Sequence, residues 1–108
     1  MTLKKLRQIL KSLGDDTRLR IVNLLSEEEL TVTEICSALK INQPAVSKHL
    51  VRLRLLKIVN DRREGNCIYY SPASDVELGK IINFLLSEFN NMEVFKKDRE
   101  SLHKYRKK

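Results

Sequence analysis

The chain has 108 residues, with 21 lysines and arginines against 14 aspartates and glutamates, a net charge of +7 and a pI of about 9.6. This length fits one small domain, and the excess of positive charge favours a polyanionic partner. No stretch approaches the roughly 18 apolar residues of a membrane helix, and residues 1–6 lack the apolar core of a signal peptide, so we expect a cytoplasmic protein with no membrane partner.

Two amphipathic helices are predicted in the first 26 residues. Leucine and isoleucine recur at helical spacing over residues 3–13, and Gly14 follows as a helix stop. Asp15 is a good N-cap for a second helix that runs to about Ser26. Three glutamates at 27–29 then form a polar link.

A helix-turn-helix is predicted next. Thr31 and Glu34 have the spacing of a capping box, in which each side chain bonds the backbone amide of the other residue at the start of a helix. Residues 40–41 form the turn. Asn42 is the next N-cap, and Pro44 lies in the first turn, where its missing N–H costs nothing.

The helix predicted over residues 42–56 has two different sides. Val46, Leu50 and Leu53 fall on one side and fit a core, while short polar and basic groups fall elsewhere. A recognition helix that reads duplex DNA needs this division. The predicted DNA-binding residues of this helix are Gln43, Pro44, Ser47, Lys48, Arg52 and Arg54.

A β-hairpin, or wing, is predicted over residues 59–71. Two short strands flank a turn that contains Gly65. Arg62 and Arg63 come just before the tip, within reach of a flanking DNA backbone or minor groove. We predict that Arg62, Arg63 and Asn66 are the DNA-binding residues of the wing.

The last predicted helix is capped by Ser74 and carries a long apolar stripe. Together with the first helix, this stripe is the candidate dimer interface, and ordinary core packing is an equally good interpretation. The candidate interface residues are Leu3, Leu6, Leu10, Leu78, Ile81, Ile82, Leu85, Leu86 and Phe89.

The predicted architecture is mainly α with a small β-hairpin, a winged helix-turn-helix in the order α-α-α-α-β-β-α that forms a homodimer. Residues 1–89 make the DNA-binding and dimerisation domain. Residues 90–108 are a basic C-terminal extension, either helical or disordered.

Four stretches in order resemble the ArsR/SmtB family of winged-helix repressors: residues 13–21, 29–35, 43–50 with Leu53-Arg54, and 62–65 with Tyr69-Tyr70. The resemblance covers about residues 10–71. It implies a homodimer built from the first and last helices, which binds double-stranded DNA at an inverted-repeat operator until an effector relieves repression. It also implies that Ser47 and His49 lie in the major groove and that Arg63 contacts flanking DNA, so His49 joins the predicted DNA-binding residues. His49 lies toward the core side of its helix, so it either packs and bonds a phosphate or contacts a base.

The family's known metal sites are not matched. Arsenic- and cadmium-sensing members carry Cys-Val-Cys where this chain has Thr31-Val32-Thr33, and soft metalloids need thiolates. Residues 74–89 contain no His for the family's zinc-type site, and His103 is a lone histidine. We therefore expect no metal and no cofactor, and the sequence identifies no effector.

Several other functions compete with this one. Cys36 and Cys67 could form a thiol redox switch, but a small buried residue and a strand residue are the simpler interpretation. The basic extension could drive non-specific, architectural DNA binding, and the wing with the last helix could bind a protein partner. The sequence has no phosphate loop, no paired carboxylates beside a base and no recognisable Cys–His pair, so we expect no catalytic residue and no enzyme.

Overall fold

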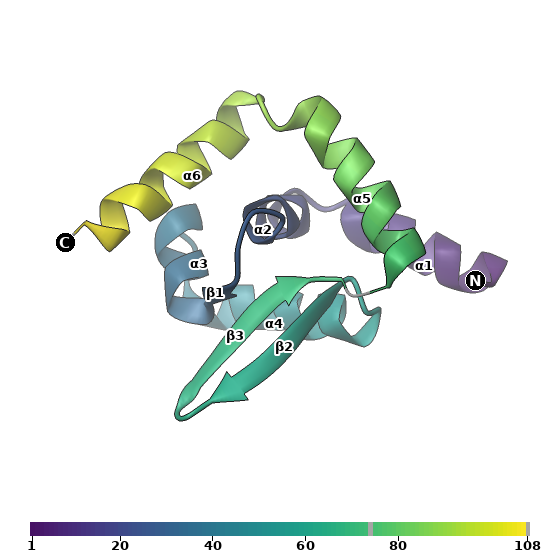
Figure 1. Ribbon diagram of the computed structural model, residues 1–108, viewed down its shortest axis with the longest axis horizontal. Helices are drawn as coiled ribbons and strands as arrows, with labels where there is room; N and C mark the ends of the chain where they lie inside the picture. The colour runs from purple at the N-terminus through teal and green to yellow at the C-terminus, as the bar shows by residue number, and fades with distance from the viewer. Residues whose placement is uncertain (74, 108) are drawn as a thin grey trace.

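The computed structural model describes residues 1–73 and 75–107. Helices are arranged around α2 (Asp16–Leu25) in the middle of the molecule, and the hairpin of β2 (Val59–Glu64) and β3 (Cys67–Pro72) lies at one edge and extends away from it (Figure 1). The elements in chain order are α1 (Leu3–Leu13), α2 (Asp16–Leu25), β1 (Leu30–Thr31), α3 (Val32–Leu39), α4 (Gln43–Leu55), β2 (Val59–Glu64), β3 (Cys67–Pro72), α5 (Val76–Phe89) and α6 (Glu93–Arg106).

Five helices begin with a side chain that accepts a hydrogen bond from the backbone amide three residues later, at 2.9 to 3.2 Å. Such bonds satisfy amides that have no partner within the helix. These N-caps are Thr2, Asp15, Thr31, Asn42 and Asp75. The prediction of Ser74 as the cap of α5 is wrong, because the carboxylate of Asp75 accepts from the Leu78 amide; Ser74 itself lies outside the described residues.

The sheet has the strand order β1-β3-β2. β2 and β3 pair from Val59 opposite Pro72 to Glu64 opposite Cys67, and Gly65 adopts a left-handed φ of 62° in the turn between them. The hairpin was predicted, whereas β1 was not. β1 has two residues, paired with β3 through Leu30 opposite Tyr70, and is too short to carry an alternating pattern.

The core forms where α2, α3, α4 and α5 meet the base of the hairpin. Ile21 and Leu25 of α2, Ile35 of α3 and Leu50 of α4 are completely buried at its centre. Each such side chain stabilises the fold by about 1.5–3 kcal/mol relative to leaving it exposed. This packing fixes α4 against α2 and α3, so one side of α4 is held toward solvent.

The basic extension contains a helix that packs on the rest of the chain. α6 lies against α3 and α2 (Figure 1), and its own residues Phe95, Asp98 and Leu102 are buried by this packing. The guanidinium of Arg20 in α2 donates to both carboxylate oxygens of Asp98, at 3.0 and 2.7 Å. Of the two states predicted for residues 90–108, the described part therefore adopts the helical one.

Candidate nucleic-acid interface

The turn between α3 and α4 sets the direction of α4. Lys40 has a left-handed φ of 58°, and the next amide, that of Ile41, donates to the carbonyl of Cys36 at 3.3 Å. This geometry ends α3 and reverses the chain. Asn42 then caps α4 by accepting from the Ala45 amide at 3.0 Å. The turn and the N-cap predicted from the sequence are therefore both present, and α4 begins where they place its start.

α4 has a buried side and an open side. Val46, Leu50 and Leu53 are completely buried, as predicted from their spacing. Ser47 is half-buried near the N-terminal end. The exposed predicted DNA-binding residues of α4 are Gln43, Pro44, Lys48, Arg52 and Arg54. These residues give the open side of α4 its polar and basic groups, Val51 and Leu55 are exposed as well, and the core behind α4 is apolar.

His49 points toward α2, away from the most open side of α4. Its Nδ1 lies 3.4 Å from Nη1 of Arg18 and 4.0 Å from a carboxylate oxygen of Asp15. Arg18 in turn donates from Nε to the carbonyl of Ser12 at 2.7 Å. His49 thus joins α4 to α2 and α1, which fits the packing role allowed by its sequence position.

Arg62 in the wing is held by two carboxylates. Its guanidinium donates to both oxygens of Glu29 at 2.8 and 2.6 Å and to Glu64 at 2.6 Å, and it lies 4.7 Å from the centre of the Tyr69 ring. The hydrogen bonds from Arg62 lower the pKa of Glu29. The charge of Arg62 is thereby offset within the protein, which the sequence did not indicate because Glu29 lies 33 residues away.

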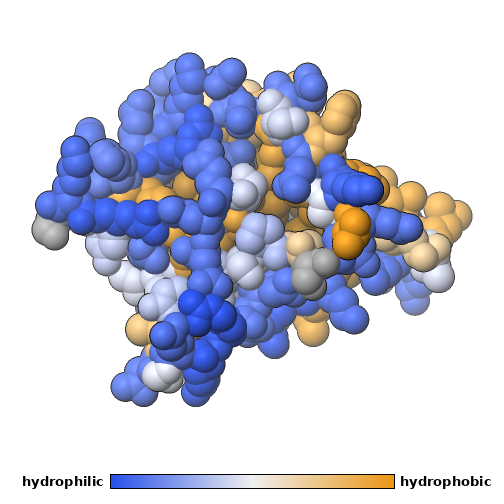
Figure 2. Space-filling model, viewed as in Figure 1, coloured by the Kyte–Doolittle hydropathy of each residue, from blue (hydrophilic) through white to orange (hydrophobic). Residues whose placement is uncertain are grey.

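Arg63 and Asn66 are both exposed at the hairpin. In the part of the chain that the structure describes, Arg63 forms no ion pair, whereas Arg54 of α4 lies 4.0 Å from Asp61 at the base of the wing. The hydrophilic surface of the hairpin extends away from the core (Figure 2). Arg63 is therefore the wing arginine with its charge available to a partner.

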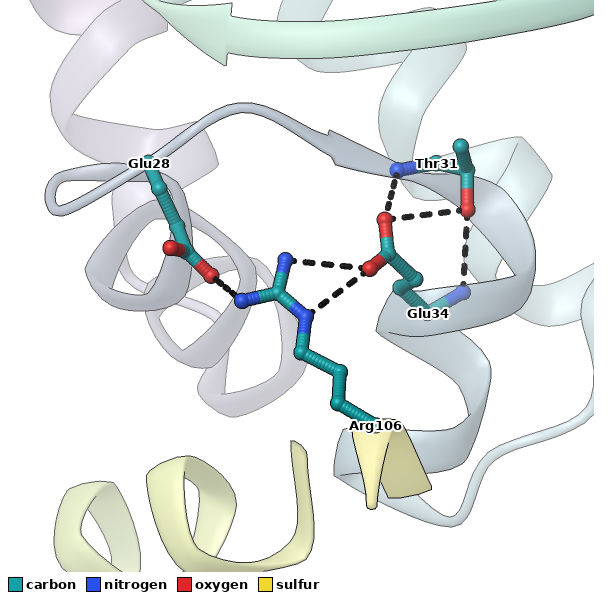
Figure 3. A network of polar contacts seen from close by, with 4 residues as sticks. All are labelled: Glu28, Thr31, Glu34 and Arg106. Carbon is teal, nitrogen blue, oxygen red and sulfur yellow. Dashed lines mark hydrogen bonds and ion pairs between the residues drawn. The ribbon is translucent and has the colours of Figure 1, made fainter. Parts of the chain in front are cut away.

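The start of α3 is occupied by a polar network (Figure 3). Glu34 closes the predicted capping box by accepting from the Thr31 amide at 3.0 Å, while Thr31 Oγ1 accepts from the Glu34 amide at 3.2 Å. Arg106 of α6 donates to Glu34 at 3.0 Å and also bonds Glu28. A network of carboxylate, hydroxyl and guanidinium groups thus occupies the start of α3.

The two cysteines lie in different environments. Cys36 is half-buried on α3, and burial raises the pKa of its thiol, while Cys67 is exposed at the start of β3. A raised pKa disfavours the reactive thiolate. Within residues 1–73 and 75–107 the structure contains no group of three or more His, Cys, Asp or Glu side chains that could hold a metal ion.

The apolar stripe of α5 divides into two sides. Leu78, Ile82 and Leu86 are buried in the core of their own protomer, so their prediction as interface residues is corrected. The stripe is wide enough to cover the core and still leave an apolar face. The exposed residues of the predicted interface are Leu3, Leu6 and Leu10 of α1 and Ile81, Leu85 and Phe89 of α5. Phe84 of α5, which was not predicted, is also exposed, at 65 %. Figure 2 shows hydrophobic residues gathered on the side where α5 and α1 lie.

No helix in the described ranges, 1–73 and 75–107, combines the length and apolar character needed to cross a bilayer.

Known proteins share this arrangement. The family model described as "Bacterial regulatory protein, arsR family" matches residues 15–61, which run from the cap of α2 into the wing. The chain is 44 % identical to the arsenical resistance operon repressor of Escherichia coli over 70 % of this chain and 68 % of that protein. It is 33 % identical to the transcriptional repressor SdpR of Bacillus subtilis over 79 % of this chain and 93 % of that protein.

The chain belongs to the ArsR family. It is accordingly a DNA-binding transcriptional regulator with a winged helix-turn-helix. Another relative, the arsenic resistance transcriptional regulator ArsR1 of Pseudomonas putida, is 46 % identical over 57 % of this chain, and that match spans about half (49 %) of the relative's own length.

Solved structures of other proteins also superimpose on most of the chain. The transcriptional repressor BigR of Xylella fastidiosa matches with a TM-score of 0.74 and 31 % identity, covering 83 % of this chain and 88 % of BigR. The winged helix-turn-helix domain of Mb0332 from Mycobacterium bovis, described as homodimeric and DNA-binding, matches with a TM-score of 0.72 and 25 % identity, covering 84 % and 87 %.

Proposed function

We propose that this ArsR-family protein is a homodimeric transcriptional repressor that binds an inverted-repeat operator through α4 and the hairpin β2–β3. The observation that carries the proposal is the division of α4, with Val46, Leu50 and Leu53 buried and the polar residues beside its N-terminal end open to solvent. The major groove of B-DNA admits an α-helix of this kind. Acting on the chromosome, the protein would work in the cytoplasm.

The residues of α4 and the wing take different roles in this proposal. Gln43, Ser47 and Lys48 lie near the N-terminal end of α4 and read base edges. Exposed cations farther along α4 and in the wing bind phosphates and supply affinity without sequence preference. His49 positions α4 against α2. The proposed phosphate and backbone contacts are Pro44, Arg52, Arg54, Arg62, Arg63 and Asn66.

The two copies would meet through the exposed apolar face of α1 and α5. Phe84, Ile81 and Leu85 of α5 are 65 %, 49 % and 42 % exposed, which is costly for a lone protomer in water. An isologous dimer buries the same face on both subunits. Mb0332, a relative of similar structure, is described as homodimeric. The proposed interface consists of Leu3, Leu6, Leu10, Ile81, Phe84, Leu85 and Phe89.

The packing of α6 weakens the alternative of a non-specific architectural binder. Arg99 lies 4.0 Å from a carboxylate oxygen of Glu27, and Arg106 is bound to Glu28 and Glu34, so these two cations of the extension are already paired with carboxylates. A charge held in such a pair contributes less to binding a polyanion.

A DNase I footprint of the purified protein on genomic fragments tests the proposal. Two-fold symmetry predicts a protected inverted repeat whose half-sites are centred about 34 Å, or one helical turn, apart. Protection spread evenly along each fragment, with no inverted repeat, would instead favour an architectural role.

A further inference from the structure

A groove of about 930 Å³ lies between α1 and α4, and Arg18 of α2 also lines it. Volumes of roughly 300–1,000 Å³ are typical of sites for small organic ligands. The groove is outside the proposed dimer surface. At 100° per residue, Gln8 and Lys11, which line the groove, lie on a different side of α1 from the exposed leucines Leu6 and Leu10.

The lining combines positive charge with exposed hydrocarbon. Lys11, Arg18, Lys48 and Arg52 line the groove, and no carboxylate does so among the described residues. Leu55 also lines it and is 73 % exposed. Cations without a carboxylate favour an anionic group, and the leucine favours an apolar one.

Ser12 supplies a further polar group. This residue lines the groove and is only 3 % exposed, yet within the described ranges its hydroxyl has no hydrogen-bond partner. A buried hydroxyl without a partner costs free energy that a bound acceptor would recover. Arg18 is fixed beside it, since Nε donates to the Ser12 carbonyl at 2.7 Å and Nη1 lies 3.4 Å from His49.

We propose that this groove binds a small amphipathic anion, a carboxylate or phosphate head attached to a hydrocarbon chain. The head lies among Lys11, Arg18 and the Ser12 hydroxyl, and the chain covers Leu55 and its neighbour Val51. Two other occupants fit less well. DNA phosphates match the cations but not the exposed leucine, and α1 of a second copy carries Lys4, Lys5 and Arg7, which the cations of the groove would repel.

Such a ligand would regulate DNA binding, and this consequence rests on the proposed function. The groove is bounded by α1, which carries part of the proposed dimer face, and by α4, the proposed recognition helix. Lys48 and Arg52 belong to both surfaces, so an anion in the groove competes with DNA for their charge. A ligand that binds the DNA-free form better must weaken operator binding by the same factor.

Calorimetric titration without DNA tests the site directly, with decanoate and decyl phosphate as probes and decanol as the uncharged control. Lys11→Glu should weaken decanoate binding about tenfold or more, whereas Lys4→Glu, the same change elsewhere on α1, should change it less than about twofold. Ser12→Ala should weaken it about fivefold and leave the melting temperature unchanged or higher. Tighter decanoate than decyl phosphate would assign a carboxylate, and the reverse a phosphate.

Three results would overturn the site: no heat from either anion up to about 1 mM, equal loss in Lys11→Glu and Lys4→Glu, or equal binding of decanol. Leu55→Asp is a second variant at an exposed position, and should abolish decanoate binding while sedimentation still shows a dimer. Dissociation of that dimer would assign the groove to a second copy and overturn the ligand proposal.

Operator binding separates this proposal from the proposed function. Decanoate should lower the operator affinity of the unmodified protein about tenfold and leave that of Leu55→Asp unaltered, each variant being compared with itself without decanoate. The protein could bind decanoate in the calorimeter and yet show no preference for an operator. That result would contradict the proposed function and leave the ligand site standing. Unchanged operator affinity at saturating decanoate would overturn the regulatory role of the groove.

Discussion

Arg106 of α6 donates to Glu34, the same carboxylate that closes the capping box of α3 (Figure 3). α6 is thereby joined to α3, the first helix of the helix-turn-helix. Both partners are partly solvated, because their side chains are 39 % and 20 % exposed. The capping bonds made by Glu34 should therefore contribute more to stability than its ion pair does.

The first prediction compares these two residues. Glu34→Ala should lower the free energy of unfolding by about 1 kcal/mol, because it removes an acceptor for a helix-terminal amide. Arg106→Ala should lower it by no more than about 0.5 kcal/mol, as expected for a solvated ion pair. Urea unfolding measures both, with the exposed Glu100→Ala as control. A larger loss in Arg106→Ala than in Glu34→Ala would contradict this order.

The second prediction concerns the ion pair between Arg20 and Asp98. The Asp98 side chain is 3 % exposed, and its loss leaves a partly buried guanidinium with one remaining bond, to the carbonyl of Leu39. Asp98→Ala should cost about 3 kcal/mol and expose α6 to proteolysis. The measurement is urea unfolding together with limited trypsin digestion. Behaviour equal to that of Glu100→Ala would show that α6 does not depend on this pair.

The third prediction is a pH dependence at the start of α2. The backbone amide of Arg18 donates to Asp15 and lowers the pKa of this carboxyl below its ordinary value of 3.8. The charged cap therefore contributes stability above pH 3.8, and the contribution is lost as pH falls through the lower pKa of the folded state. Asp15→Ala should cost about 1 kcal/mol at pH 7 and progressively less below pH 3.8.

Asp15→Asn is the control for this pH dependence, because it keeps a capping oxygen that does not titrate. Its stability relative to Asp15→Ala should stay constant with pH in urea unfolding experiments. A cost of Asp15→Ala that is the same at pH 3 and pH 7 would rule out the charge of Asp15 as the source.

The fourth prediction tests the proposed dimer face. Phe84→Glu places a charge on the exposed side of α5 and should raise the dimer dissociation constant at least about 100-fold without unfolding the protomer. Sedimentation equilibrium gives the constant. Val94→Glu, at a 38 % exposed position on α6, should leave it unchanged. Equal effects of the two substitutions would show that the dimer interface does not lie on the exposed face of α5.

Local features of the fold could be predicted because their causes lie a few residues apart. Thr31 with Glu34, and Asn42 followed by Pro44, fix the starts of α3 and α4 through bonds that span three residues. The spacing of Val46, Leu50 and Leu53 likewise identified the core side of α4. The helix-turn-helix, which carries the candidate site, therefore follows from neighbouring residues.

Contacts between distant residues could not be predicted in this way. Arg62 bonds Glu29 33 residues away, and Arg20 bonds Asp98 78 residues away, and one sequence contains no signal that pairs them. The stripe of α5 was identified, but periodicity alone could not separate its buried members from its exposed ones. Ile82 is buried and the adjacent Ile81 is exposed, although the two side chains are chemically identical.

The fifth prediction addresses the central claim, that α4 reads sequence while the wing binds backbone. Lys48→Ala and Ser47→Ala should reduce the preference for the footprinted operator over a scrambled duplex, each by about 1–3 kcal/mol. Arg63→Ala should weaken both duplexes equally and reduce the salt slope by about 1. Arg62→Ala should have a smaller effect on that slope, because Glu29 and Glu64 already hold this guanidinium.

The most direct measurement is a fluorescence-anisotropy titration of these four variants against operator and scrambled DNA over a range of salt concentrations. The account predicts lost preference in the two α4 variants and uniform weakening in Arg63→Ala. Equal effects of Ser47→Ala, Lys48→Ala and Arg63→Ala on both duplexes would contradict it.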